Sequence, residues 1–176
     1  MVTNGPRAWS LLVCSLVLVY ALGALAGAPP KEPPPPPKPG EPGTILFSAT
    51  EPPKKFKNKK AREEAFAKSV TEFTANEDEE WNIHFHALLN GKAGTRNLQL
   101  WFIDITENPD NEKAKTIFQI TAKPKSRTVI DKVMLDLEDW DADQKIKLRV
   151  MRVNQKKGRA TVLAEGTFTL KGSGAL

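Results

Sequence analysis

From about Thr44 onward, apolar and polar side chains alternate along most of the chain, and this alternation limits the folds open to the chain more than any other feature. A period of two places successive side chains on opposite faces of a strand, so one face is buried and the other is solvated. The alternation is clearest in four segments, which we expect to be strands: 81–89, 133–138, 145–150 and 161–170. A chain built from such segments buries its apolar faces by packing sheets together.

Other segments alternate less regularly. Residues 98–105 are apolar at even positions as far as Phe102 and at odd positions from Trp101 onward. This predicts either a central strand that is covered on both faces or a bulge that changes the register near Phe102. We expect further strands at 44–48, 69–75 and 116–122, and one short helix at 58–68, where alanine and glutamate are frequent.

Seven to eight strands, separated by turns rich in asparagine, glycine and proline, predict an all-β domain over residues 44–176 that folds as an antiparallel β-sandwich. The run from Leu135 to Leu148, with Trp140 between them, resembles the corner between strands E and F of immunoglobulin-like folds. The resemblance implies an immunoglobulin-like or related sandwich. The chain departs from that pattern because its only cysteine and its only tyrosine, Cys14 and Tyr20, precede the domain, so the disulfide and the corner tyrosine are absent.

The first 26 residues have the layout of a secretory signal peptide. Arg7 precedes a nearly uninterrupted apolar run from Ala8 to Ala26, which ends in the small-x-small sequence Ala24-Leu25-Ala26. We expect cleavage after Ala26 and export of the domain. The alternative is an uncleaved hydrophobic helix that anchors the domain to a membrane, because a run of about 19 residues is long enough to span a bilayer.

Residues 27–43 form a proline-rich linker. The stretch 29–42 reads PPKEPPPPPKPGEP and has nine prolines in fourteen residues. Proline fixes φ and has no N–H, so we expect a disordered or polyproline II segment outside the core. Extended in this way, the segment is either a spacer of about 40 Å that holds the domain away from a surface or an unstructured leader.

Cations gather in one segment of this chain, whose net charge is +5. The segment 53–62 reads PKKFKNKKAR, and we expect its cations to bind a polyanion: Lys54, Lys55, Lys57, Lys59, Lys60 and Arg62. An exported protein meets anionic lipid and surface polymer rather than nucleic acid, so we expect no nucleic acid partner. The alternative is a solvated continuation of the linker. An acidic run, 77–80, follows this segment.

The two histidines, His84 and His86, lie on the polar face of one expected strand. Side by side they offer two ligands, whereas a catalytic zinc needs three and a structural zinc needs four. The domain has no thiol to complete such a site or to act as a nucleophile, because Cys14 precedes it. We therefore read these histidines as part of a solvated strand face.

The acidic residues Asp139, Asp141 and Asp143 have the spacing of the first three ligands of a calcium loop. Gln144 and Val150 stand where that loop requires a glycine and a bidentate glutamate, so the motif is incomplete. A G-x-x-x-x-G-K phosphate loop is also missing. We expect no catalytic residue, no metal and no cofactor.

These observations favour a non-enzymatic binding or structural domain of a bacterial cell envelope, periplasmic or secreted, whose partner is an envelope protein or an anionic surface polymer or lipid. A bacterial envelope is favoured because the exported domain has no disulfide. One alternative is a small carbohydrate-handling module or enzyme, since Trp81, Trp101 and Trp140 are candidates for stacking on sugars. A further alternative is an assembly component that the N-terminal helix tethers to the inner membrane, with the domain outside the cytoplasm.

Overall fold

The computed structural model describes residues 37–154 and 158–173. The signal-like segment 1–26 and most of the linker lie outside these residues. The described part contains eight strands and one helix: β1 (Ile45–Ser48), α1 (Lys59–Ala67), β2 (Glu72–Thr74), β3 (Glu80–Leu88), β4 (Asn97–Asp104), β5 (Thr116–Thr121), β6 (Thr128–Asp136), β7 (Lys145–Asn154) and β8 (Arg159–Lys171).

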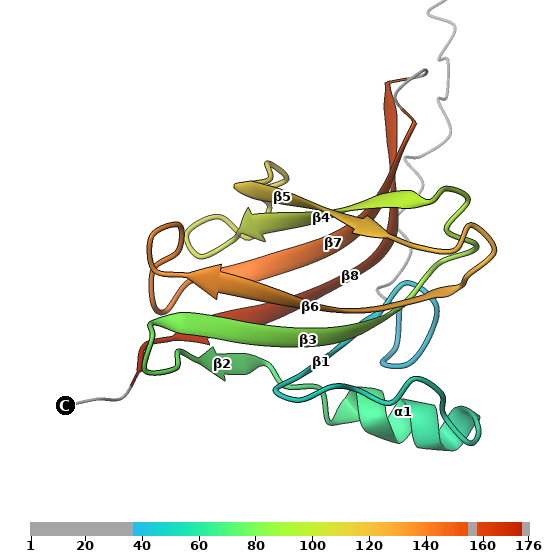
Figure 1. Ribbon diagram of the computed structural model, residues 1–176, viewed down its shortest axis with the longest axis horizontal. Helices are drawn as coiled ribbons and strands as arrows, with labels where there is room; N and C mark the ends of the chain where they lie inside the picture. Colours follow the sequence, from blue (N-terminus) through green and yellow to red (C-terminus); the bar gives the residue numbers. More distant parts are fainter. Residues whose placement is uncertain (1–36, 155–157, 174–176) are drawn as a thin grey trace, which may run out of the picture. The chain divides into compact units, whose positions relative to one another are not determined.

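The strands pair in two sheets, one with the order β1-β3-β6 and the other with the order β2-β8-β7-β4-β5 (Figure 1). Neighbouring strands are antiparallel, except that β2 runs parallel to β8. In an immunoglobulin-like sandwich, strands A, B and E share one sheet and C, F and G share the other. Here β1, β3 and β6 take the first set of places and β4, β7 and β8 the second, so the predicted all-β, immunoglobulin-like sandwich is confirmed.

The main core lies between the two sheets and is built from alternate residues of both. Trp81, Ile83 and Phe85 of β3 are fully buried, as the period of two predicts. Leu163, which interrupts the alternation in β8, is buried because a bulge shifts the register of β7 and β8 between Val150 and Met151. A bulge adds one residue to one strand and turns the following side chains to the other face.

Strand β4 is covered on both faces at Ile103, which is fully buried. The β4–β5 connection, 105–115, lies over its outer side. Asn111 donates to the carbonyl oxygen of Asp104 at 2.7 Å, and the carboxylate of Glu112 pairs with Arg149 and Lys147 of β7. Of the two expectations for 98–105, the strand covered on both faces is therefore correct, and the bulge lies in another strand pair.

Helix α1 covers part of the outer face of the three-stranded sheet (Figure 1). It confirms the helix predicted at 58–68, and the side chain of Asn58 caps it by accepting a hydrogen bond from the amide of Ala61 at 2.8 Å. A second, smaller cluster of buried side chains lies beneath it: Leu46, Phe66 and Leu88, with Phe56 and Ala65 packed against them.

The last residues of the predicted linker contact the domain. Gly40 is buried beside Glu63 of α1. The amide of Gly43 donates a hydrogen bond to the carbonyl oxygen of Leu88 at 2.6 Å, and the carbonyl oxygen of Gly43 accepts one from the amide of Glu165 at 2.9 Å. These bonds connect the start of β1 to strands of both sheets, so the chain enters the sandwich before residue 44.

Gly166 allows β1 to approach β8. A Cβ atom at this position would lie 2.7 Å from Cε2 of the buried Phe47 and 3.2 Å from Cβ of Ile45. We expect Gly166→Ala to lower the free energy of unfolding by about 1–3 kcal/mol, the usual cost of overpacking a core, measured by urea denaturation. Gly172→Ala is the matched control, because its Cβ would make only an ordinary contact, 3.5 Å from Cβ of Ala142. Equal losses in the two variants would show that the approach of β1 to Gly166 is not the cause.

Candidate functional site

The predicted polyanion-binding segment, 53–62, lies against the outer face of the three-stranded sheet. The ring of Phe56 stacks on that of His86, with centroids 5.2 Å apart, and lies 6.0 Å from the ring of Phe66. Three of the six cations have acidic partners close by in sequence: Lys54 with Glu51, Lys59 with Glu63 and Lys60 with Glu64. These pairs offset half of the segment's positive charge, while Lys55 and Lys57 are exposed and in no ion pair among the described residues.

The two histidines differ in their surroundings. His84 is half-buried, whereas His86 is 1% exposed beneath Phe56. Nδ1 of His86 lies 3.0 Å from the carbonyl oxygen of Pro53; because that oxygen can only accept, Nδ1 carries the proton. Nε2 is then a buried acceptor without a partner in the described structure. Burial lowers the pKa of His86 below its ordinary value of 6.5, and the bond to Pro53 offsets this in part.

Two of the three carboxylates with calcium-like spacing have partners within the protein. Asp141 accepts a hydrogen bond from the side chain of Gln144 at 3.0 Å, and Asp143 pairs with Lys171 at 2.8 Å. Across residues 37–154 and 158–173, no group of three histidine, cysteine or acidic side chains lies close enough together to hold a metal ion.

The three tryptophans of the domain do not form a common platform. Trp81 and Trp140 are buried in the core, so the expectation that they stack on sugars is wrong for both. Trp101 is half-buried on the outer face of the five-stranded sheet, where it is paired across strands with Ile117. Its Nε1 donates to Oε1 of Gln99 at 2.8 Å. One indole therefore remains at the surface, beside an amide side chain.

Charge is sorted between the two ends of the sandwich. The connections β3–β4 and β5–β6 lie at one end of the sandwich, on the right of Figure 1, and the β7–β8 hairpin rises above the sheets on the same side. In these connections and the strand residues next to them, the described part of the chain has seven cations and no carboxylate: Lys92, Arg96, Lys123, Lys125, Arg127, Arg152 and Arg159. None of the seven takes part in an ion pair with another described residue. We call this surface the basic loop end.

The opposite end is acidic. The β2–β3, β4–β5 and β6–β7 connections bring ten carboxylates together: Glu77, Asp78, Glu79, Glu107, Asp110, Glu112, Glu138, Asp139, Asp141 and Asp143. Two lysines in the same connections, Lys113 and Lys115, compensate little of this charge. The domain is therefore strongly polarised along its strands, which its net charge does not reveal.

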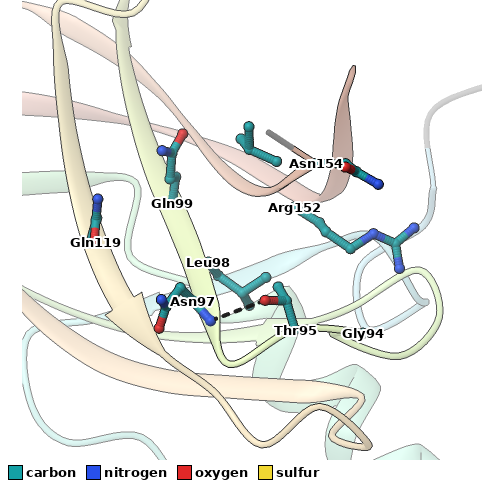
Figure 2. A pocket seen from close by; sticks show the side chains of 9 residues that line it. Gly94, Thr95, Asn97, Leu98, Gln99, Gln119, Arg152 and Asn154 are labelled. Carbon is teal, nitrogen blue, oxygen red and sulfur yellow. Dashed lines mark hydrogen bonds between the residues drawn. The ribbon is translucent and has the colours of Figure 1, made fainter. Parts of the chain in front are cut away.

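A cleft opens between β4 and β7 at the basic loop end. The pairing of these strands ends at Gln99 and Met151, although β4 begins at Asn97 and β7 continues to Asn154. Beyond the bulge, the β7–β8 hairpin bends away from the sheet (Figure 1). The cleft has a volume of about 410 Å³ and the following lining: Gly94, Thr95, Asn97, Leu98, Gln99, Gln119, Arg152, Val153 and Asn154 (Figure 2).

The polar side chains of the cleft lining are four amides, one hydroxyl group and one cation. Gln99 and Gln119 are direct partners across β4 and β5. Because Oε1 of Gln99 accepts the proton of Trp101, the amide nitrogen of Gln99 is left to donate elsewhere. Gly94 has a φ of +73°, and a Cβ there would lie 2.7 Å from Nη1 of Arg152, so this glycine leaves room for the guanidinium group.

Neither the basic loop end nor the cleft was expected from the sequence. The cations of these connections are separated by whole strands, whereas 53–62 is one continuous run. One signal was available: the three turn segments at 90–96, 123–127 and 154–159 are all basic and have no acidic residue. In an antiparallel sandwich, alternate connections return to the same end, so their charges add at one surface.

In the described part of the chain, no helix has the length and hydrophobicity needed to cross a bilayer. No protein-family model matches the sequence, and no curated protein matches it. Among solved structures, the chain is similar to a crystal structure of an immunoglobulin-like protein from Pseudomonas aeruginosa, with 19% sequence identity, a TM-score of 0.33 and coverage of 59% of this chain and 80% of that chain. A likeness of this degree says nothing about a ligand or an activity.

Proposed function

We propose that this chain is an exported, non-enzymatic binding domain of a bacterial cell envelope and that its basic loop end holds an anionic surface polymer. The observation that carries the proposal is the group of seven cations in three connections that hold no carboxylate, none of them in an ion pair with another described residue. Unpaired charges of one sign on one surface attract a polymer of the opposite sign. Each lysine or arginine near an anionic surface contributes about 1 kcal/mol.

Three further observations support parts of this proposal. The signal-like start and the proline-rich linker support export and display away from a surface. Lys55 and Lys57 of the segment 53–62 add two cations without ion pairs in the described structure, so that segment is a second, weaker contact. The cleft lining holds no histidine, carboxylate or thiol, which leaves its one hydroxyl, on Thr95, without a general base. A binding role therefore fits this site better than catalysis.

A carbohydrate-binding module is the second candidate. It is favoured by the half-buried Trp101, which lies beside an amide of the cleft. An aromatic ring next to neutral hydrogen-bonding groups suits the apolar face and the hydroxyl groups of a sugar. The two candidates are compatible when the anionic polymer is a glycan.

Binding of the purified full chain to immobilised polygalacturonate, with neutral dextran as the reference polymer, tests the proposal. We expect binding to polygalacturonate at low ionic strength and its loss at about 1 M salt, where the Debye length falls to about 3 Å. The combined variant Lys123→Gln, Lys125→Gln, Arg127→Gln is expected to bind about tenfold or more weakly, from about 1 kcal/mol for each lost charge less partial screening.

The matched control is Lys113→Gln, Lys132→Gln, Lys145→Gln. It removes the same net charge from exposed positions outside the basic loop end, none of which is in an ion pair among the described residues. We expect its affinity to fall less than about twofold, because distant charges are screened. Equal losses in the two variants, or equal binding to dextran, would overturn the proposal.

A further inference from the structure

Strand β5 is the last strand of the five-stranded sheet, so one side of it has no neighbouring strand (Figure 1). The amide of Ala122, directly after β5, donates to the carbonyl oxygen of Arg96 at 2.8 Å, so even-numbered residues of this strand direct their backbone groups toward β4. In an antiparallel pair this direction alternates from residue to residue. The N–H and C=O groups of Ile117, Gln119 and Thr121 therefore point away from β4, and they have no hydrogen-bond partner in the described part of the chain.

The other edges of the two sheets are short or are closed by side chains. On β6, the hydroxyl group of Ser126 accepts a hydrogen bond from the amide of Thr128 at 3.1 Å and donates one to the carbonyl oxygen of the same residue at 2.5 Å. The carboxylate of Asp131 accepts one from the amide of Lys132 at 2.9 Å. Strands β1 and β2 have only four and three residues. Such devices prevent a further strand from pairing, whereas β5 has six residues and no such cap in the described structure.

The open edge is uncharged along its length and is flanked by lysines. Residues 116–122 read TIFQITA and include no charge, no proline and no glycine. Lys113 and Lys115 precede this stretch, and Lys123 and Lys125 follow it. All four lysines are exposed, and none is in an ion pair with another described residue. The edge therefore offers backbone groups between two pairs of cations.

The core is also incompletely covered at this edge. Leu98 and Leu100 of β4 are fully buried, whereas their cross-strand partners Ile120 and Phe118 on β5 are only partly buried, although they face the same core. A further strand beside β5 would place every second side chain next to these two residues. The apolar surface that it removed from water would stabilise the pairing in addition to the backbone hydrogen bonds.

The lysines decide which strand fits this edge. In the antiparallel register that pairs the three open residues of two copies of the chain, Gln119 faces its own equivalent, and Lys115 faces Lys123 of the second copy at both ends. Like charges directly opposite each other destabilise a strand pair. A strand with carboxylates at both ends would instead place opposite charges together in either direction of pairing.

From these features we infer that β5 is the docking edge for an extended segment of a partner protein, with about seven uncharged, strand-forming residues between acidic ends, which joins the five-stranded sheet as a further strand. The partner is held by backbone groups of the edge, so the binding does not depend on the anionic polymer of the proposed function.

Fluorescence anisotropy of labelled peptides with the full chain at low ionic strength tests the inference. The probe is the peptide DETVTVTVTED. The peptide KKTVTVTVTKK has the same centre with cationic ends, and DEGSGSGSGED has the same acidic ends with a flexible centre. We expect the probe to bind about tenfold or more tightly than either control, because like charges repel and glycine disfavours a strand. Equal binding of the probe and either control would contradict the inference.

Gln119→Pro removes one N–H group of the open edge and, because that group points away from β4, leaves the hydrogen bonds between β4 and β5 in place. We expect this variant to bind the probe about tenfold or more weakly, and the matched control Gln119→Ala, which keeps the N–H group, to lose less than about twofold. If the probe binds Gln119→Pro as tightly as the wild type, charge alone holds it and the inference is wrong, although the basic loop end still binds polyanions.

N-methylation of the probe tests the same hydrogen bonds without altering the protein. Two versions carry methyl groups on the two alternate sets of backbone nitrogens, and only one set faces β5. We expect one version to bind about tenfold or more weakly than the other, and equal affinities would contradict the pairing. A wild-type chain that is dimeric by light scattering and monomeric as Gln119→Pro would show that a second copy occupies the edge, which also overturns the inference.

Discussion

Replacement of Trp140 by alanine is expected to lower the free energy of unfolding by about 3–5 kcal/mol, as for other buried aromatic residues. Trp140 is 1% exposed and belongs to the β6–β7 connection, from which its side chain packs into the core. Its ring packs edge-on to that of Phe102, with centroids 6.2 Å apart, and Nζ of Lys115 lies 4.4 Å from its centroid. The variant leaves a cavity and exposes Phe102, and chemical denaturation measures the loss.

Trp101→Ala provides the matched control, because it deletes the same side chain from a half-buried position on a sheet face. We expect a loss below about 1.5 kcal/mol, since much of the indole is already in contact with water. If the two variants were equally destabilised, Trp101 would be a core residue and unavailable to a ligand. A large loss in Trp101→Ala alone would reverse the roles assigned to the two indoles.

The stability of the domain is expected to fall as the pH is lowered through the range in which His86 titrates. Burial holds the pKa of His86 below that of a solvated histidine, so the unfolded chain binds the proton first. The free energy of unfolding therefore keeps the full contribution of neutral His86 above pH of about 6.5 and loses it below that value. The slope is at most about 1.4 kcal/mol per pH unit, the value for one proton taken up on unfolding.

Denaturation curves between pH 4.5 and pH 8 for the wild type and His86→Phe measure this contribution. Phenylalanine keeps a ring under Phe56 but cannot take up a proton, so the difference between wild type and His86→Phe isolates the titration from that of the carboxylates. A curve for His86→Phe that runs parallel to that of the wild type would mean that His86 has the same pKa in the folded and the unfolded chain, which would contradict the prediction.

The alternation of apolar and polar side chains was sufficient to predict the β-sandwich fold. In β3, β7 and β8 a period of two marked the buried face correctly, and the core follows from it. The same rule accounts for the burial of Trp81 in β3, but it does not apply to Trp140, because that residue lies in a connection between strands. Periodicity describes strands, and the burial of a loop residue depends on what the rest of the fold places above it.

For the candidate site, local sequence was a poor guide. The run 53–62 stood out because its cations are neighbours in the chain, yet three of them have acidic partners close by. The cleft could not be predicted from the sequence, because it exists only where β4 and β7 are unpaired, before Gln99 in β4 and after Met151 in β7. A change in strand pairing leaves no composition signal in either strand.

The sequence by itself determined that the domain is a β-sandwich. The alternation of side chains is a local property of each strand, and it determines which face of the strand is apolar and therefore buried. Only the tertiary structure decided where charge and hydrogen-bonding groups meet. Arg96, Arg127 and Arg152 come from three different connections or strand ends, and the antiparallel pairing of the strands brings them to one end of the sandwich. Residues far apart in the chain come together only through the pairing of the strands, and a local sequence pattern contains no information about that pairing.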